Sequence, residues 1–502
     1  MKRSFTMKKL LSIILAAVVV LSCCAGIITY AAQDDSYDHL PQVYIEGFES
    51  KRVYYKDDAN KTSLLYPIDS GRMSTATSNI KNTLTNSLKS FDFRLVYNCV
   101  YGWMDELLGD TKLEPDGITM QDNVTVDATE LNYKGDGKYV FKYDSRLDPV
   151  DLAKELNEYI GWVKEDTGSD KIELVGSSFG SSVELAYMSE YGTDCLDSIL
   201  FCVPSMEGIN FVSQLFTGDF HFDSDAVEAF ASNAIGNDAV TTILQLLNES
   251  GILRLLIDTT VEPLLKVALK NALHDAIHDI LATHPAMWAF VKAEYFDDAI
   301  EYVFGKDKDT YSKLIEKVTY YHKNIKVKDR DILQKAIDDG HHVSIICKYN
   351  MPPFPFTYEG NFMGDGFVET AVASLGATCA MNGESFPDCY KQKLYPEKNY
   401  MSPDWCIDAS TCFLPDNTWF VKDLAHGDKN DSYYGMINYI IYNDIDVFSD
   451  PNCSQFLQNI SGYVVPTQDG KFAPKDNFFQ HIFKLLKQLF TTIIEKIKSL
   501  FN

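Results

Sequence analysis

The sequence predicts an α/β fold: a mostly parallel sheet with helices on both faces, a large helical insertion and a C-terminal amphipathic helix. Three observations predict it. Apolar strand-like runs alternate with amphipathic helical segments between residues 138 and 203, which is typical of a parallel sheet. A long series of helical patterns then follows, and a strand-like run returns at 342–348. Finally, 46% of the residues are hydrophobic and 23% are charged, as expected for a chain that buries a core.

The alternation can be followed segment by segment. After the short β-rich runs PQVYIEG and SLLYP, the segment KYVFKY at 138–143 predicts a strand. Residues 149–165 place apolar side chains every three or four positions, which predicts an amphipathic helix. The runs at 171–175 and 197–203 predict two further strands, with a helix between them.

The chain divides where these patterns change. We expect, in order, a signal peptide, the first part of an α/β core, a helical insertion, the second part of the core and a C-terminal helix, at residues 1–31, 32–206, 207–340, 341–470 and 471–502. Two independent domains are the alternative. They explain the pattern less well, because they would leave the strand at 342–348 without partners.

The first 31 residues have the three parts of an export signal. Four basic residues precede the apolar run LLSIILAAVVVLSCCAGII, and the small-residue stretch TYAA follows it. We therefore expect cleavage after Ala31 and a protein that is secreted or attached to the cell surface. The alternatives are a retained membrane anchor, because the apolar run is long, and lipid attachment at Cys23.

The net charge of the chain bears on whether it binds nucleic acid, and its cysteines bear on whether it forms disulfides. The chain has 71 acidic and 45 basic residues, a formal net charge of −26. Such a surface repels phosphate backbones, so we expect no nucleic-acid partner.

Eleven cysteines are present without a CxxC motif. The nearest loop pairs are Cys406–Cys412 and Cys379–Cys389, and both disulfides and buried thiols are compatible with this spacing.

The C-terminal segment 478–501 predicts an amphipathic helix. Its large apolar side chains fall on one side and its lysines on the other. The segment is too charged to span a bilayer. Two interpretations stay open: a helix that docks on its own domain, and an interfacial helix that makes peripheral contact with a membrane or a partner.

The segment KIELVGSSFGSSVELA at 171–186 carries the main catalytic pattern. A strand-like run leads into a GxSxG sequence, Gly176 to Gly180, and a helical pattern follows at once. A nucleophile elbow needs this order, because its strained turn leaves no room for side chains at the flanking positions. We predict that Ser178 is a nucleophile at a helix N-terminus, where unpaired amides favour developing negative charge. A glycine-rich turn without chemistry is the alternative.

A serine nucleophile needs a base, and the base needs an orienting carboxylate. In a strand–elbow–helix architecture these follow the serine in the order acid, then histidine. Asp365, in a Gly-Asp-Gly turn after the strand at 342–348, is the candidate acid. His426, after the strand-like TWFV, is the candidate base, because the other histidines lie too early in the chain, in the helical insertion or in the C-terminal segment. For both residues an ordinary loop position is the alternative.

An oxyanion hole needs two backbone amides. We predict those of Phe179, directly after the nucleophile, and Phe48, in the loop after the first core strand. No metal and no organic cofactor are predicted. His274 and His278 lack the glutamate of an HExxH motif, and neither a GxxxxGK[ST] nor a GxGxxG sequence occurs.

On these motifs the chain resembles an α/β-hydrolase, specifically the branch of lecithin–cholesterol acyltransferase-like enzymes and bacterial lipases. The resembling segments are IEGF, YDSRLDP, LVGSSFG, CVPS, GDGFV and the late histidine loop, which span most of residues 40–430. The resemblance implies Ser178 as nucleophile, Asp365 as acid and His426 as base. It also implies that the insertion is a lid and that lipid esters are the substrates.

The chain departs from the family pattern at four positions. Ser177 stands where the family usually has histidine, and Ser181 where it has a second glycine. Glu46 precedes the glycine of the oxyanion loop, and Ser145 replaces the aromatic residue of a YDWR-like motif. These departures bear more on the substrate class than on the triad.

We therefore expect a secreted serine hydrolase that cleaves carboxylic esters through an acyl-enzyme, with an ester or lipid as its small-molecule substrate. Two alternatives stay open. One is a catalytically silent fold that binds a ligand or a surface partner, and the other is an acyltransferase or amidase that uses the same triad.

Overall fold

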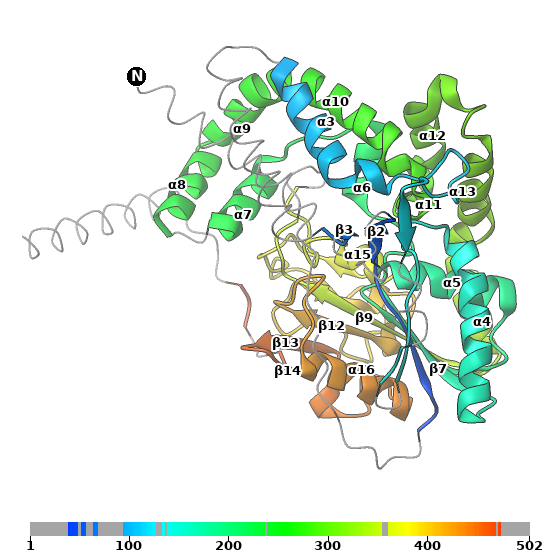
Figure 1. Ribbon diagram of the computed structural model, residues 1–502. Coiled ribbons are helices and arrows are strands. Elements are labelled where there is room, and N and C mark those ends of the chain that lie inside the picture. The colour runs from blue at the N-terminus through cyan, green and yellow to red at the C-terminus, as the bar shows by residue number, and fades with distance from the viewer. Residues whose placement is uncertain are drawn as a thin grey trace, which may run out of the picture.

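A nine-stranded sheet forms the centre of the protein, with helices packed on both faces (Figure 1). The computed structural model describes residues 39–48, 52–56, 64–68, 94–126, 133–135, 138–235, 238–353, 360–467 and 470–472. The expected signal peptide and the helix expected at 478–501 lie outside these residues. The architecture is the α/β arrangement that the alternation of strands and helices predicts.

The sheet has the strand order β14-β13-β12-β9-β8-β7-β1-β6-β5. The seven inner strands in this order pair in parallel with one another, and the edge strands β5 and β14 pair antiparallel with β6 and β13. In chain order the strands are β1 (Gln42–Ile45), β5 (Tyr133–Gly135), β6 (Lys138–Phe141), β7 (Ile172–Ser177), β8 (Leu196–Cys202), β9 (His342–Tyr349), β12 (Thr418–Lys422), β13 (Phe456–Ile460) and β14 (Tyr463–Pro466).

Two small sheets lie outside the main one. One is three-stranded and the other two-stranded, and their members are β2 (Val53–Tyr55), β3 (Leu64–Tyr66), β4 (Val124–Val126), β10 (Thr378–Cys379) and β11 (Ile407–Asp408).

The central strands are apolar on both faces because helices cover both faces. In β7, Leu174 belongs to one core cluster and Val175 to the other. The first cluster includes α4 (Pro149–Thr167), α5 (Phe179–Tyr191) and much of the helical insertion. The second includes α16 (Asp431–Asn443), whose buried tyrosine, methionine and isoleucine side chains pack on the opposite face.

Local sequence explains where α4 begins and ends. Asp148 is the N-cap, and its side chain accepts a hydrogen bond from the amide of Val150 at 2.9 Å. Pro149 occupies the first helical position, where its missing N–H costs nothing. Gly168 ends the helix with φ of 69°, a left-handed conformation that favours glycine.

The segment between β8 and β9 is helical, and Figure 1 draws it in green above the sheet and beside α3 (Arg94–Leu108). The last helix of the segment packs against β9 and α5 and so belongs to a layer that covers the sheet. The helices are α6 (Asn210–Thr217), α7 (Ser224–Ile235), α8 (Asp238–Glu249), α9 (Ile252–Leu256), α10 (Glu262–Asp279), α11 (Pro285–Ala289), α12 (Phe296–Phe304), α13 (Ser312–Asn324) and α14 (Asp329–Asp338).

Eight cysteines have side chains that the structure describes, and all eight are free thiols, so neither Cys406–Cys412 nor Cys379–Cys389 forms a disulfide in this structure. Five of the eight are buried, where a thiol packs as a small apolar side chain. Within the described ranges, no helix combines the length and apolar character that crossing a bilayer requires.

Candidate active site

Ser178 lies at the sharp turn between β7 and α5. Its backbone has φ of 54° and ψ of −121°, a conformation that residues other than glycine rarely adopt. The flanking glycines make the turn sterically feasible. A Cβ at Gly176 would lie 2.9 Å from the carbonyl oxygen of Gly180, and one at Gly180 would lie 2.6 Å from the carbonyl oxygen of Ile45. Both glycines of the GxSxG sequence therefore have a steric reason.

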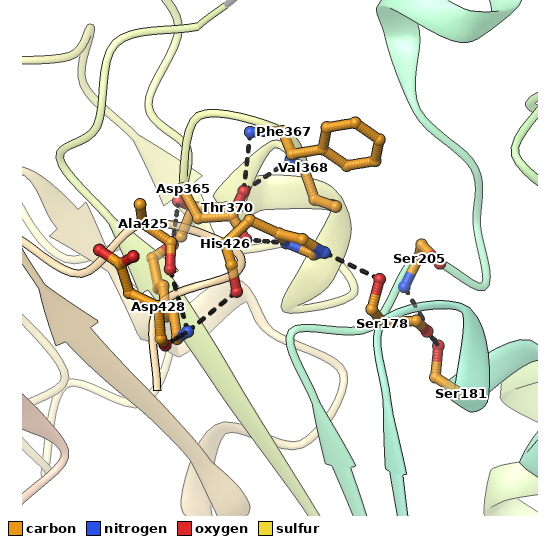
Figure 2. Close-up of polar contacts among 11 residues, drawn as sticks. Ser178, Ser181, Ser205, Asp365, Phe367, Val368, Thr370, Ala425, His426 and Asp428 are labelled. Atoms are coloured by element: carbon orange, nitrogen blue, oxygen red, sulfur yellow. Dashed lines mark hydrogen bonds and ion pairs between the residues drawn. The ribbon is translucent and has the colours of Figure 1, made fainter. Parts of the chain in front are cut away.

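Hydrogen bonds fix the backbone of the turn (Figure 2). The Ser178 amide donates to the carbonyl of Cys202 at 2.9 Å, at the end of the neighbouring strand β8. Ser181 Oγ donates to the Ser178 carbonyl at 2.5 Å and accepts from the Ser205 amide at 3.1 Å. Ser181, where the resemblance expects glycine, thus ties the first turn of α5 to the loop after β8.

Figure 2 shows that the structure brings Ser178, His426 and Asp365 together. Ser178 Oγ lies 2.8 Å from His426 Nε2, although the two residues are 248 positions apart. His426 Nδ1 lies 2.6 Å from Asp365 Oδ2. A carboxylate can only accept hydrogen bonds, so the imidazole carries its proton on Nδ1 and accepts from the serine at Nε2.

Asp365 is held in its ionised form. Its carboxyl group is buried, which alone would raise its pKa, but the adjacent His426 and three hydrogen bonds bring the pKa below the ordinary value. Two of those bonds come from the amides of Phe367 and Val368, which donate to Oδ1 at 2.9 and 2.7 Å. The Asp365 carbonyl also accepts from the His426 amide at 2.9 Å, so the two loops are joined through their backbones.

Sheet topology explains why these loops meet. Asp365 follows β9 and His426 follows β12, and these strands are parallel neighbours. Strand β8 lies between β9 and β7, which carries Ser178 at its end. The carboxyl ends of parallel strands lie at one edge of a sheet, and ligand sites are common there.

The loop after β1 lies directly beside the serine. A Cβ at Gly47 would be 3.3 Å from Ser178 Cβ. The buried Tyr143 hydroxyl donates to the carbonyls of Glu46 and Gly47, the second at 3.1 Å. Because the carbonyl and the N–H of a trans peptide point in opposite directions, the Phe48 amide is directed away from Tyr143.

The amide of Phe179 is the first of α5 and has no acceptor within that helix. The predicted oxyanion residues Phe48 and Phe179 also touch through their rings, whose centroids are 6.0 Å apart. The structure therefore places both predicted amide donors on segments next to Ser178. Their use as an oxyanion hole stays a prediction.

Aromatic side chains from the insertion border the same region. The Phe290 ring, directly after α11, lies 5.6 Å from that of Phe48 and 6.4 Å from that of Phe367. Phe367 in turn lies 5.1 Å from the His426 ring and 5.1 Å from the ring of Phe211 in α6. Phe211 and Phe290 were not predicted, because in sequence they are indistinguishable from the other apolar residues of the insertion.

One further residue at the site was not predicted. Lys348, in β9, sends its ammonium group to the backbone of the loop that carries His426. A sequence signal exists, because a lysine within the apolar run HVSIICKY is unusual in a strand buried on both faces.

The histidine pair in α10 makes hydrogen bonds within the helical insertion. His274 contacts Asp275 and the Tyr302 carbonyl, each at 3.0 Å, and His278 contacts Asp279 at 2.8 Å. In the part of the chain that the structure describes, no three His, Cys, Asp or Glu side chains are grouped so that they could hold a metal ion.

No family model matches the chain, and no curated protein matches it. Six chains of known structure match, among them one from a structure titled "The crystal structure of Tle4-Tli4 complex". That match has 12% sequence identity and a TM-score of 0.28, and it covers 62% of this chain and 74% of the other. A TM-score this low supports no conclusion about activity, so the proposals below depend on the geometry of this chain alone.

Proposed function

We propose that this protein is an exported serine hydrolase of the α/β-hydrolase fold that cleaves carboxylic esters through an acyl-enzyme. The observation that carries the proposal is the continuous hydrogen-bonded series from Ser178 Oγ through His426 to Asp365, at 2.8 and 2.6 Å. It joins a hydroxyl on a strained turn, an imidazole and a buried ionised carboxylate, the groups that nucleophilic catalysis by serine requires.

The proposed reaction has two halves. Ser178 Oγ attacks the ester carbonyl carbon while its proton passes to His426 Nε2. The carbon–oxygen bond to the alcohol then breaks, and the alcohol leaves with the proton from Nε2. Water next gives a proton to Nε2 and attacks the acyl carbon, and the carboxylic acid leaves as Ser178 regains its proton.

Two further groups have proposed roles in each half. Asp365, whose pKa lies below the ordinary value, stabilises the imidazolium without taking its proton. The Phe48 and Phe179 amides receive the oxyanion, helped by the N-terminus of α5, and removal of one such donor typically costs about 10²–10³-fold in kcat.

The proposed substrate is an ester with an apolar acyl or alcohol group. The Phe367 ring beside His426, and the Phe211 and Phe290 rings that pack on Phe367, support this class, because apolar surface binds apolar groups. Since Phe211 and Phe290 belong to the insertion, we propose that the insertion acts as a lid over the bound substrate.

Labelling with a fluorophosphonate probe tests the proposal. We expect the purified wild-type protein to gain one phosphonyl group on Ser178, located by peptide mass spectrometry. Ser178→Ala should not be labelled. Ser177→Ala, which alters the neighbouring buried serine, should be labelled as in the wild type. A folded wild-type protein that is neither labelled nor active on p-nitrophenyl esters would be a silent binding fold instead.

A further inference from the structure

Lys348 is a buried cation at the end of β9. Its relative exposure is 1%. Its Nζ lies 3.0 Å from the carbonyl oxygen of Ala425, 3.0 Å from that of His426 and 2.6 Å from that of Asp428. An ammonium group has three donors, so these three carbonyls use all of them. The carbonyls belong to the loop drawn around His426 in Figure 2.

Burying the Lys348 ammonium group costs desolvation free energy, and strand pairing in the sheet gives no reason for that cost. Burial lowers the pKa of Lys348 to about 7, although the carboxylates of Asp365 and Asp428 favour its charged form. The ring of Tyr433, 4.5 Å from Nζ, offsets part of the desolvation. Strand β9 pairs through its backbone alone, so an apolar side chain at position 348 would serve the sheet as well. The benefit of the ammonium must therefore lie in the loop.

The loop needs a donor at its centre. Three carbonyls that converge on one buried point would leave unpaired acceptors if the ammonium were absent, and each such group costs about 1–3 kcal/mol. The loop would then relax to find other donors. Because its backbone sets the position of the imidazole, such a change would alter the distances from His426 to both Ser178 and Asp365.

Lys348 also contacts the loop of the acid. Its carbonyl accepts a hydrogen bond from Thr370 Oγ1 at 3.1 Å, and Thr370 follows Asp365 in the same loop region. One residue of β9 is thus bonded to the histidine loop through its side chain and to the acid loop through its backbone.

We propose that Lys348 is a positioning residue, whose ammonium group holds the His426 loop so that the imidazole reaches Ser178 and Asp365 together. The consequence for catalysis rests on the function proposed above. The geometric part does not, because the bond between His426 and Asp365 can be observed without turnover.

Lys348→Met is the main variant, because methionine fills similar space without a donor. We expect the rate of fluorophosphonate labelling and kcat for a p-nitrophenyl ester to fall about 100-fold, the size expected for a misplaced catalytic group, with little change in KM. Lys348→Gln retains a neutral donor and should fall less than Lys348→Met. Wild-type rates in folded Lys348→Met would overturn the proposal, and so would an equal loss in Lys348→Gln and Lys348→Met.

Lys326→Met is the matched control. Lys326 is also buried, its pKa is also lowered to about 7 by burial, and it donates to the Ala289 carbonyl at 2.7 Å, away from the His426 loop. We expect it to lower the melting temperature while the labelling rate stays within about twofold of wild type. An equal loss of labelling in Lys326→Met and Lys348→Met would mean that any buried lysine has this effect, and would overturn the proposal.

Proton NMR provides a readout that does not depend on activity. The Nδ1–H of His426, bonded to Asp365 at 2.6 Å, should give a far-downfield signal that is absent in His426→Gln. In Lys348→Met this signal should shift or be lost through exchange. An unchanged signal would overturn the role of Lys348. A wild-type protein that is never labelled would refute the proposed function and leave this test of Lys348 intact.

Discussion

At the residue scale, the role proposed for Asp365 depends on its contact with His426. Its carboxylate accepts two backbone amides on one oxygen and the imidazole on the other, so its position is fixed on both sides. A group held this firmly can select one imidazole tautomer, and that tautomer is the one that accepts the proton of Ser178.

Asp365→Asn should preserve the shape of the site and remove its activity. An amide that donates to Nδ1 would favour the wrong tautomer, and we expect kcat to fall about 10⁴-fold with the melting temperature near that of wild type. Asp431→Asn changes an exposed carboxyl group at the start of α16, just after the histidine loop, and should keep near-normal kcat. Steady-state kinetics on a p-nitrophenyl ester measures both. Equal activity of Asp365→Asn and Asp431→Asn would exclude Asp365 from the proposed triad.

The site residues that could be predicted from the sequence each lie next to a local sequence pattern. Ser178 stands between glycines that the tight turn requires, and Asp365 and His426 follow strands whose apolar runs are visible in the sequence. Lys348 and Tyr143 act on backbone carbonyls of loops far away in the chain. The sequence shows that a lysine in an apolar strand is unusual, but it does not show which carbonyls such a side chain contacts, because any carbonyl is an equal acceptor.

At the element scale, the turn between β7 and α5 is packed against the loop after β1. Gly180 is the point of closest approach: a Cβ there would meet the carbonyl oxygens of Ile45 and Glu46 at 2.6 and 2.7 Å. These are backbone atoms, which cannot move aside as a flexible side chain can. The helix and the oxyanion loop therefore depend on each other's positions.

Gly180→Ala should displace the loop that carries Phe48. We expect kcat to fall about 100-fold, as for loss of an oxyanion donor, together with lower stability. Gly161→Ala is the control, because Gly161 lies in α4 with nothing within 4 Å of its Cβ, and it should gain about 0.5–1 kcal/mol from better helix propensity. Steady-state kinetics measures kcat of both variants, and thermal unfolding measures their stability. An unchanged kcat in Gly180→Ala would show that the position of the Phe48 loop does not affect catalysis.

The sequence predicts the central elements better than the peripheral ones. Strands β7, β8 and β9 are continuous apolar runs because both faces are buried, and α4 has its cap, its proline and its terminal glycine in place. Helix α16 and strands β13 and β14 were not predicted. The two strands have only five and four residues, so their periodicity is weak, whereas the buried residues of α16 do recur at helical spacing in the sequence.

At the scale of the whole molecule, aromatic contacts join the insertion to the segments beside Ser178. Phe290, 3% exposed, packs its ring against those of Phe48 and Phe179, at 5.6 and 5.5 Å. Sequence predicts that a helical segment interrupts the sheet. It does not predict which of its residues lie beside the candidate site, because that depends on how the helices pack and not on their periodicity.

This arrangement makes Phe290 the test of whether the insertion selects the substrate. Phe290→Leu removes aromatic surface beside the oxyanion loop, and we expect the ratio of kcat/KM for long over short p-nitrophenyl esters to change about tenfold. Phe304→Leu is the control, since Phe304 is equally buried in α12 but stacks on Trp288, at 5.2 Å. Both variants should lose about 1 kcal/mol or more of stability through the cavity that is left. Only Phe290→Leu should change the ratio, because Phe290 packs against Phe48 and Phe179, on the segments that flank Ser178, and Phe304 does not. If both variants keep the wild-type ratio, the insertion covers the site without selecting its substrate.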